Sequence, residues 1–159
     1  MFCMNIKIIA IGKIREKYLI EAQKEYEKRL QKFCSLEIIE LSAEEILDET
    51  LLGKYKKLEG ERILKQLKDN SFVITLEING KNFSSEEFAQ KIKNIACEGN
   101  NEIVFIIGGA NGLDSEVSKR ANLKLSFSAM TFTHQLIRVI LLEQIYRAFK
   151  INANESYHR

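Results

Sequence analysis

The sequence of 159 residues has few of the side chains that build metal centres and disulfide frameworks. Its three cysteines, Cys3, Cys34 and Cys97, lie far apart and show neither C-x-x-C nor histidine spacing, so we expect neither a disulfide framework nor a zinc site. The only histidines are His134 and His158, too few for a site of three or four ligands. We therefore expect no bound metal.

Proline and long hydrophobic runs are also absent. No repeat or linker divides the chain, and 45% hydrophobic with 29% charged residues is ordinary folded composition, so we predict one domain over residues 1–159. No apolar stretch is long enough for a membrane span, and the start at Met1 lacks the features of a signal peptide, which predicts a cytoplasmic protein. Residues 1–3 precede the first expected strand, so Met4 is an alternative start.

The net charge of +2 hides an uneven distribution of charged residues. Residues 7–32 hold eight Lys or Arg against four Glu, residues 37–62 hold eight acids against four bases, and residues 115–159 hold seven bases against three acids. Basic ends around an acidic middle could offer phosphates one face, although solvated helix faces produce the same pattern. The role of the acidic stretch 37–61 stays open.

Apolar periodicities of two and of 3.6 residues alternate along the chain, which predicts a parallel α/β sheet within an α/β/α sandwich. Strands are expected at 4–11, 36–41, 72–78, 103–107 and 123–127. Helices are expected at 14–33, after a mobile acidic stretch within 42–67, from a capping box at Ser84 and Glu87 onward, after Asp114 or Ser115, and at 134–150.

Three glycine positions shape these expectations further. Gly53 and Gly60 weaken the case for one continuous helix over 42–67. The pair Asn79-Gly80 is expected to turn the chain at the end of the third strand.

Two of the expected strands run straight into loops that are suited to hold a ligand. The strand 103–107 continues as Gly108-Gly109-Ala110-Asn111-Gly112, and the strand 123–127 continues into the polar and aromatic segment 128–134. Open α/β sheets bind ligands at the carboxyl ends of their strands, where paired glycines keep the space free of side chains. We predict that these two strands are central neighbours and that the binding site lies at their ends.

The glycine loop does not match the common phosphate-binding patterns. It follows a late strand, lacks the lysine of a phosphate loop, and is followed by Asp114, whose charge would repel phosphate. A neutral or cationic ligand held by backbone groups is one interpretation, and a tight turn without a ligand is the other. No G-x-S-x-G elbow frames a serine nucleophile near His134.

Several runs of the last third, taken together, form a specific combination. They are 107–113, 125–134, Arg138, Glu143-Gln144, 146–148 and the terminal Tyr157-His158-Arg159, with further matches at 9–13 and 74–81. This combination resembles the ribosomal RNA large-subunit methyltransferase H family, which are small knotted SPOUT methyltransferases. The chain departs from the family at Thr133 and at Glu155-Ser156, where proline is common, which leaves loop stiffness and tail geometry open.

The resemblance implies a C-terminal trefoil knot, an exception to the rule that chains avoid knots. It also implies S-adenosylmethionine as the cofactor, a sulfonium compound without a phosphate. The cofactor contacts that it implies are Leu76, Gly108, Phe127, Ser128, Ala129, Met130, Thr131 and Phe132. For Phe127 and Phe132, ordinary core packing is the alternative.

The implied reaction is methylation of N3 of a pseudouridine in 23S ribosomal RNA, by a homodimer with composite sites. The catalytic candidates are His158, Arg159 and Arg138, which could accept a proton or stabilise an anion. Tyr157 and His134 are the candidates for substrate binding. An unimportant tail is the alternative for residues 157–159, and helix capping with an interhelical hydrogen bond is the alternative for His134 and Arg138.

Two further expectations concern the long C-terminal helix. Glu143 and Arg147 are spaced for a structural salt bridge, and the apolar stretch 136–145 offers a dimer face. The substrate expected is rRNA in the assembled ribosome, because a small protein with modest basic patches needs a preformed surface. The alternatives are a SPOUT methyltransferase acting on another RNA such as tRNA, and a non-catalytic ribosome- or RNA-binding module.

Overall fold

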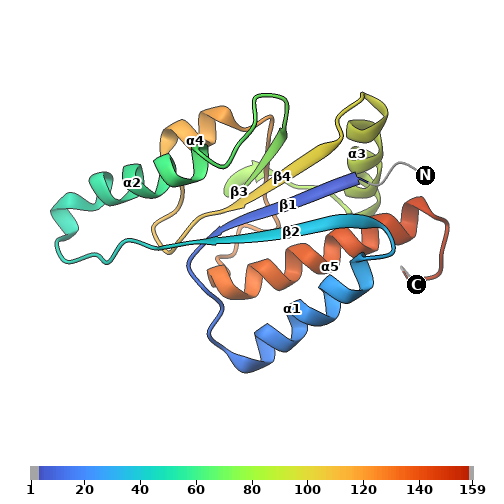
Figure 1. Cartoon of the computed structure of the whole chain (residues 1–159), viewed down its shortest axis with the longest axis horizontal. Coiled ribbons are helices and arrows are strands. Elements are labelled where there is room, and N and C mark those ends of the chain that lie inside the picture. The colour runs from blue at the N-terminus through green and yellow to red at the C-terminus, as the bar shows by residue number, and fades with distance from the viewer. Residues whose placement is uncertain (1–3, 158–159) are drawn as a thin grey trace.

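A five-stranded sheet forms the centre of the protein in the computed structural model, which describes residues 4–157 (Figure 1). All its strands are parallel, and their order across the sheet is β2-β1-β4-β3-β5. The strands are β1 (Met4–Ile11), β2 (Cys34–Leu41), β3 (Phe72–Lys81), β4 (Glu102–Ile107) and β5 (Leu123–Leu125). The predicted parallel sheet is therefore confirmed.

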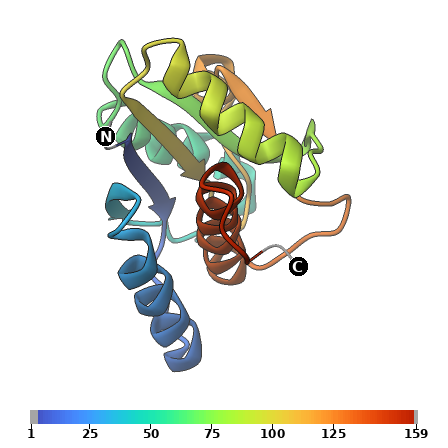
Figure 2. The ribbon, with the colours of Figure 1, turned by 90° about the vertical axis from the view of Figure 1, so that its right-hand side faces the viewer.

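Helices cover both faces of this sheet and complete an α/β/α sandwich (Figures 1 and 2). Helices α1, α3 and α5 lie on one face, where α5 packs between the other two, and helices α2 and α4 lie on the opposite face. The helices are α1 (Lys17–Leu30), α2 (Leu52–Leu64), α3 (Ser85–Cys97), α4 (Ser115–Arg120) and α5 (His134–Asn152), with a 3-10 turn η1 (Glu49–Leu51) before α2.

Apolar side chains of the strands alternate between two hydrophobic cores, one on each face of the sheet. In β1, Ile6 and Ile8 belong to the cluster under α1, α3 and α5, whereas Ile9 and Ile11 belong to the cluster under α2 and α4. Successive side chains of a strand point to opposite faces, so a strand buried on both faces is apolar at every position. Residues 103–107 of β4 are all buried, as the continuous apolar run predicted.

The helix starts follow the capping signals in the sequence. The hydroxyl of Ser84 accepts from the backbone N–H of Glu87, and the carboxylate of Glu87 accepts from the backbone N–H of Ser84, which confirms the predicted capping box. Asp114 caps α4 by accepting from the N–H of Glu116. Thr133 caps α5 by accepting from the N–H of Leu136 at 3.2 Å, which fixes the start of the long helix.

Residues 42–67 do not form one continuous helix, as expected, because irregular chain and the 3-10 turn η1 precede α2, whereas the turn expected at Asn79-Gly80 is wrong. Helix α2 runs without interruption through Gly53 and Gly60, and a Cβ at Gly60 would lie only 2.8 Å from Asp114 Cβ, so this glycine allows α2 to approach α4. Strand β3 continues through Gly80 instead of turning there. A Cβ at Gly80 would lie 2.7 Å from the carbonyl carbon of Leu125, so this glycine lets β3 and β5 come together.

The predicted neighbourhood of the two ligand-binding strands also needs correction. Strand β5 is an edge strand that ends at Leu125, and β3 lies between it and β4. Hydrophobic patterns give the strands of a sheet but not their order, and the connection through α4 carries the chain past β3. No helix within residues 4–157 is both long and apolar enough to cross a membrane.

Candidate functional site

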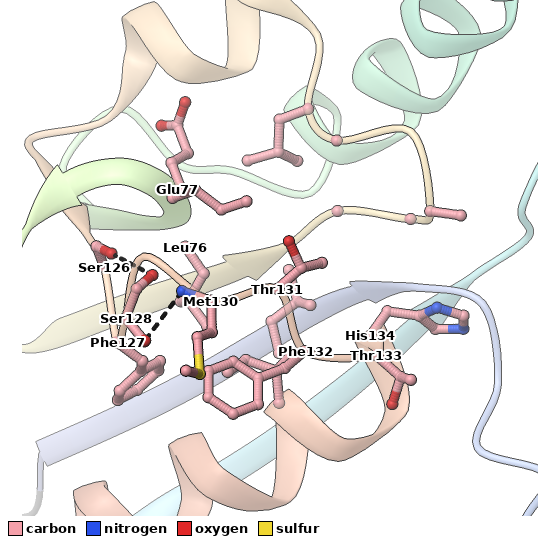
Figure 3. A pocket seen from close by; sticks show the side chains of 18 of the residues that line it. Leu76, Glu77, Ser126, Phe127, Ser128, Met130, Thr131, Phe132, Thr133 and His134 are labelled. Atoms are coloured by element: carbon pink, nitrogen blue, oxygen red, sulfur yellow. Dashed lines mark hydrogen bonds between the residues drawn. The ribbon is translucent and has the colours of Figure 1, made fainter.

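A cavity of about 590 Å³ opens at the carboxyl ends of β3, β4 and β5 (Figure 3). Its walls come from four places: residues 76–78 in the second half of β3, the glycine loop after β4, the segment from Leu125 at the end of β5 to Thr133, and the first turn of α5. The two loops expected to hold a ligand therefore meet around one space, although their strands are not adjacent. The volume lies in the range of small-molecule sites.

The glycine loop presents its backbone to this cavity. The N–H of Gly112 donates to the carbonyl of Gly109 at 3.1 Å, and Gly112 has a positive φ of 81°, which closes a tight turn. A Cβ at Gly108 would lie 3.0 Å from both Gly112 C and Leu113 Cδ2. A larger residue at Gly108 would force this turn apart, so the close packing of the loop depends on the glycine.

The second loop is organised by its serine hydroxyls (Figure 3). Ser126 is buried, and its hydroxyl donates to the carbonyl of Ser128 at 3.1 Å. The hydroxyl of Ser128 accepts from the N–H of Met130 at 3.0 Å. These bonds fold the segment into a fixed wall, while the side chain of Met130 remains 76% exposed at the mouth of the cavity.

Seven of the eight residues predicted to contact a cofactor line this cavity. They are Leu76, Gly108, Phe127, Ser128, Met130, Thr131 and Phe132, and the eighth, Ala129, is not among the lining residues. Phe127 also packs against the main core, so core packing and lining are combined at this position. His134, predicted to bind substrate, lines the same cavity. The roles of these residues stay predictions.

Glu77 is a lining residue that the sequence analysis missed. Its carboxylate accepts from the hydroxyls of Thr75 at 2.6 Å and of Ser118 at 2.8 Å, which fix its position on the cavity wall. The signal that could have revealed it is a lone acid beside Leu76, in a strand whose preceding residues are apolar or hydroxyl-bearing.

The electrostatics of the wall select against anions. Among the described residues that line the cavity, Glu77 is the one carboxylate and there is no Lys or Arg. Asp114, expected to repel phosphate, does not line the cavity, and it is the N-cap of α4, one of the two positions expected for that role. An apolar space with backbone groups and one carboxylate suits a neutral or cationic ligand.

Arg138 lies behind the cavity wall and is entirely buried. Its guanidinium donates to Glu40 Oε2 at 2.6 Å and to the carbonyl of Gly12 at 3.1 Å, and its Nε has no hydrogen-bond partner among the described residues. Arg138 is not among the lining residues, so in this structure it reaches the cavity only through the residues that it holds. A direct catalytic contact by Arg138 stays a prediction.

Tyr157, the last described residue, packs far from the cavity of its own chain. The ring of Tyr157 contacts that of Tyr146 with centroids 4.8 Å apart, and the Arg147 guanidinium lies 4.8 Å from the Tyr157 ring. Burial, and then a hydrogen bond with Tyr26, raise the pKa of Tyr157. Because Tyr146 follows His134 by twelve residues, the helical rise puts them roughly 18 Å apart.

The structure therefore does not bring Tyr157 and His134 together within one chain. His158 and Arg159, both predicted to be catalytic, lie outside the described residues. The predicted salt bridge between Glu143 and Arg147 is confirmed, with a shortest distance of 2.6 Å. Among residues 4–157, no group of His, Cys, Asp or Glu is arranged to hold a metal ion.

Comparison with known proteins gives a consistent result along the whole chain. Residues 4–158 match the family described as "Predicted SPOUT methyltransferase". The chain is 54% identical to ribosomal RNA large subunit methyltransferase H of Clostridium botulinum, over 98% of this chain and 100% of that protein. It is 52% identical, with the same coverage, to the protein of that name from Clostridium acetobutylicum.

A solved structure shares the fold at low sequence identity. It is a probable methylase family protein from Haemophilus influenzae Rd KW20, which matches with a TM-score of 0.57 and 16% identity. The match covers 98% of this chain and 71% of that one.

Proposed function

The chain belongs to the SPOUT methyltransferase family, and from this premise we propose that it methylates N3 of a pseudouridine in the 23S rRNA of the large ribosomal subunit. We propose S-adenosylmethionine as the methyl donor. The observation that carries the proposal is the cavity in which the glycine turn and the serine-rich loop meet, in a chain aligned over its full length with rRNA methyltransferases.

The residues of the cavity fit this donor. A sulfonium compound has no phosphate, and the described wall offers no Lys or Arg but has apolar side chains, backbone groups and the carboxylate of Glu77. The glycine at position 108 lets the loop pack tightly on itself, which sets the position of its backbone groups at the cavity. When bound, the donor supplies an electrophilic methyl group on a positively charged sulfur.

The protein's own contribution is to position the nucleobase and manage its proton. The N3 of pseudouridine is an imide N–H that must lose its proton as it attacks, so a base or a cation close to it accelerates the reaction. We propose His158 and Arg159 for these roles, with Tyr157 and His134 as substrate contacts. Arg138 is proposed as a positioning residue, since it holds the wall on which His134 lies.

A second copy of the chain completes the proposed site. Tyr157 is anchored near the far end of α5, roughly 18 Å along the helix from its own His134. A tail that serves catalysis therefore has to reach the cavity of a partner, which supports a homodimer. We also propose that the chain around residues 108–133 and α5 forms the trefoil knot of the family. With ribosomes as substrate, the protein works in the cytoplasm.

Binding and methyl transfer test the proposal separately. Calorimetry with S-adenosylmethionine should give one site per chain, and tritium from the labelled donor should enter assembled ribosomes rather than free rRNA or tRNA. Nucleoside mass spectrometry of the product should give N3-methylpseudouridine. Absence of cofactor binding would leave only the alternative of a non-catalytic RNA-binding module. Methyl transfer to tRNA without transfer to ribosomes would show that the substrate is another RNA.

The tail and the dimer have their own tests. The variant His158→Ala should keep cofactor binding and lose methyl transfer, because the residue is proposed to act on the nucleobase. Sedimentation at micromolar concentration should show a dimer. A monomer with full activity would contradict the shared site.

A further inference from the structure

The geometry points to a docking surface for RNA backbone phosphates on the loop between β1 and α1, directly beside the cavity. We call this the basic loop and define it by Lys13 and Arg15 of the loop and Lys17, the first residue of α1, whose side chains are all exposed. The inference rests on the proposed function, because it takes the substrate to be RNA and identifies the protein surface that binds the RNA backbone. Its contacts are with phosphates and not with the reacting base.

The cations of the basic loop are not used by the fold. Within residues 4–157, none of the three takes part in an ion pair, whereas Lys7, Arg62 and Lys119 each pair with a carboxylate. An unpaired exposed cation retains its full attraction for phosphate, and three on one short segment create a local positive potential. A surface of this kind favours a polyanion.

The backbone of the basic loop is fixed although its side chains are exposed. The carbonyl of Gly12 accepts from Arg138, and the N–H of Ile14 donates to Glu40 Oε2 at 3.2 Å. The N–H of Arg15 donates to Gln135 Oε1 at 2.8 Å, and Gln135 lines the cavity. The buried Arg138 and the first turn of α5 thus hold the cations at a set position relative to the cavity.

The basic loop and the cavity share a boundary at His134. A Cβ at Gly12 would lie 3.7 Å from His134 Nε2, so the residue before Lys13 lies beside a lining side chain. In Figure 3 the ring of His134 extends from the start of α5 toward the chain that follows β1. A nucleotide that enters the cavity on this side therefore brings its neighbouring phosphates onto the basic loop.

Nearby acids weaken this potential only in part. Glu16 is exposed within the loop, whereas the carboxylate of Glu40 is already engaged by Arg138 and by the N–H of Ile14. Tyr18, which follows the loop at the start of α1, is 66% exposed and offers a flat ring to an unpaired base. Cations beside an exposed aromatic ring fit single-stranded RNA better than an acidic peptide.

The test compares two triple variants that remove the same charge. One replaces Lys13, Arg15 and Lys17 by Gln, and the control replaces Lys24, Lys28 and Lys32, which are equally exposed but lie farther along and beyond α1. Binding of labelled protein to purified ribosomes is measured without cofactor, over about 50 to 200 mM salt at constant Mg²⁺. Cofactor affinity is measured by calorimetry.

We expect the basic-loop variant to bind ribosomes at least tenfold more weakly and the control to change less than threefold. The slope of log affinity against log salt should fall by about 2 in the basic-loop variant, since each phosphate contact contributes about 0.7 to 0.9. Cofactor affinity should stay the same, and in turnover the KM for ribosomes should rise while kcat changes little. Tyr18→Ala should weaken ribosome binding without changing the salt slope.

Equal losses in the two triple variants, or an unchanged salt slope, would overturn the docking surface. This result differs from a failure of the proposed function, in which the wild-type protein would bind no S-adenosylmethionine and transfer no methyl group. If the protein transfers no methyl group but its ribosome binding still depends on the basic loop, the docking surface is supported and the proposed reaction is refuted.

Discussion

The guanidinium of Arg138 is fully buried and donates to Glu40 Oε2 at 2.6 Å, across 98 residues of sequence. This pair joins the end of β2 to the first turns of α5 and, through the carbonyl of Gly12, to the end of β1. One side chain therefore holds the ends of β1 and β2 against the start of α5, and the first turn of α5 lines the cavity. Its loss is expected to affect the stability of the fold before it affects chemistry.

The variant Glu40→Gln should show this effect. It leaves the charge of Arg138 buried without a counter-ion, and removal of one partner of a buried pair costs about 3–5 kcal/mol. Because Glu40 is 34% exposed, we expect a smaller loss of about 2–3 kcal/mol in the free energy of unfolding, measured by urea denaturation. The control Glu37→Gln removes an acid that is 62% exposed and should cost less than about 1 kcal/mol. Equal losses would contradict the argument.

The two glycines of α2 should respond to alanine in opposite directions. A Cβ at Gly53 meets nothing within 4 Å, so Gly53→Ala should stabilise the protein by about 0.5–1 kcal/mol through helix propensity. A Cβ at Gly60 would lie 2.8 Å from Asp114 Cβ, so Gly60→Ala should destabilise by about 1–3 kcal/mol as α2 moves from α4. Thermal unfolding of the two variants measures both changes, and equal shifts of the same sign would refute this packing account.

These glycines show where sequence reasoning was sufficient and where it was not. The alternation in β1 and the one capping box, at Ser84 and Glu87, act locally, so the strands and several helix starts were predictable from the residues alone. Gly60 and Gly80 have their reasons in another element, α4 and β5 respectively, which no local pattern contains. Strand order was missed for the same reason, since the place of β5 beside β3 is a tertiary property.

The cavity was predictable in its loops but not in its full wall. The glycine turn at 108–112 and the segment 127–132 could be recognised because each directly follows an apolar strand and has an unusual composition. Both segments contribute residues to the cavity wall. Glu77 was missed because a single acid at the end of a strand is usually a solvated residue. Its partners Thr75 and Ser118 become visible only once β3 and α4 are placed together.

Glu77 should matter for cofactor affinity if the proposed donor binds here. It is the one carboxylate among the described lining residues, and a charge-assisted hydrogen bond to a cationic or hydroxyl-bearing ligand contributes about 1.5–3 kcal/mol. We therefore expect Glu77→Gln to weaken S-adenosylmethionine binding by tenfold or more in calorimetry. Glu116→Gln, an exposed acid on α4, is the matched control and should leave the affinity unchanged. Unaltered binding in Glu77→Gln would show that the carboxylate only braces α4.

The anchored tail should be sensitive to alkaline pH through Tyr157. Burial raises the pKa of this phenol, and the hydrogen bond with Tyr26 raises it further. A group with a raised pKa in the folded state stabilises the fold fully below its unfolded pKa of about 10 and loses that contribution as the pH rises toward the folded value. Wild-type protein should therefore lose stability above pH ~10 more steeply than Tyr157→Phe.

Phenolate absorbance gives the direct measurement of this effect. The wild-type titration should contain one late phenol that is missing in Tyr157→Phe, because burial and the hydrogen bond with Tyr26 favour the neutral phenol and outweigh the opposite effect of the Arg147 charge. In Tyr26→Phe the burial remains but the hydrogen bond is lost, so the late phenol should titrate earlier while staying above the ordinary range. If Tyr157→Phe instead removed an early-titrating phenol, the tail would not be anchored at the end of α5, and the argument that it must serve a partner's cavity would lose its structural basis.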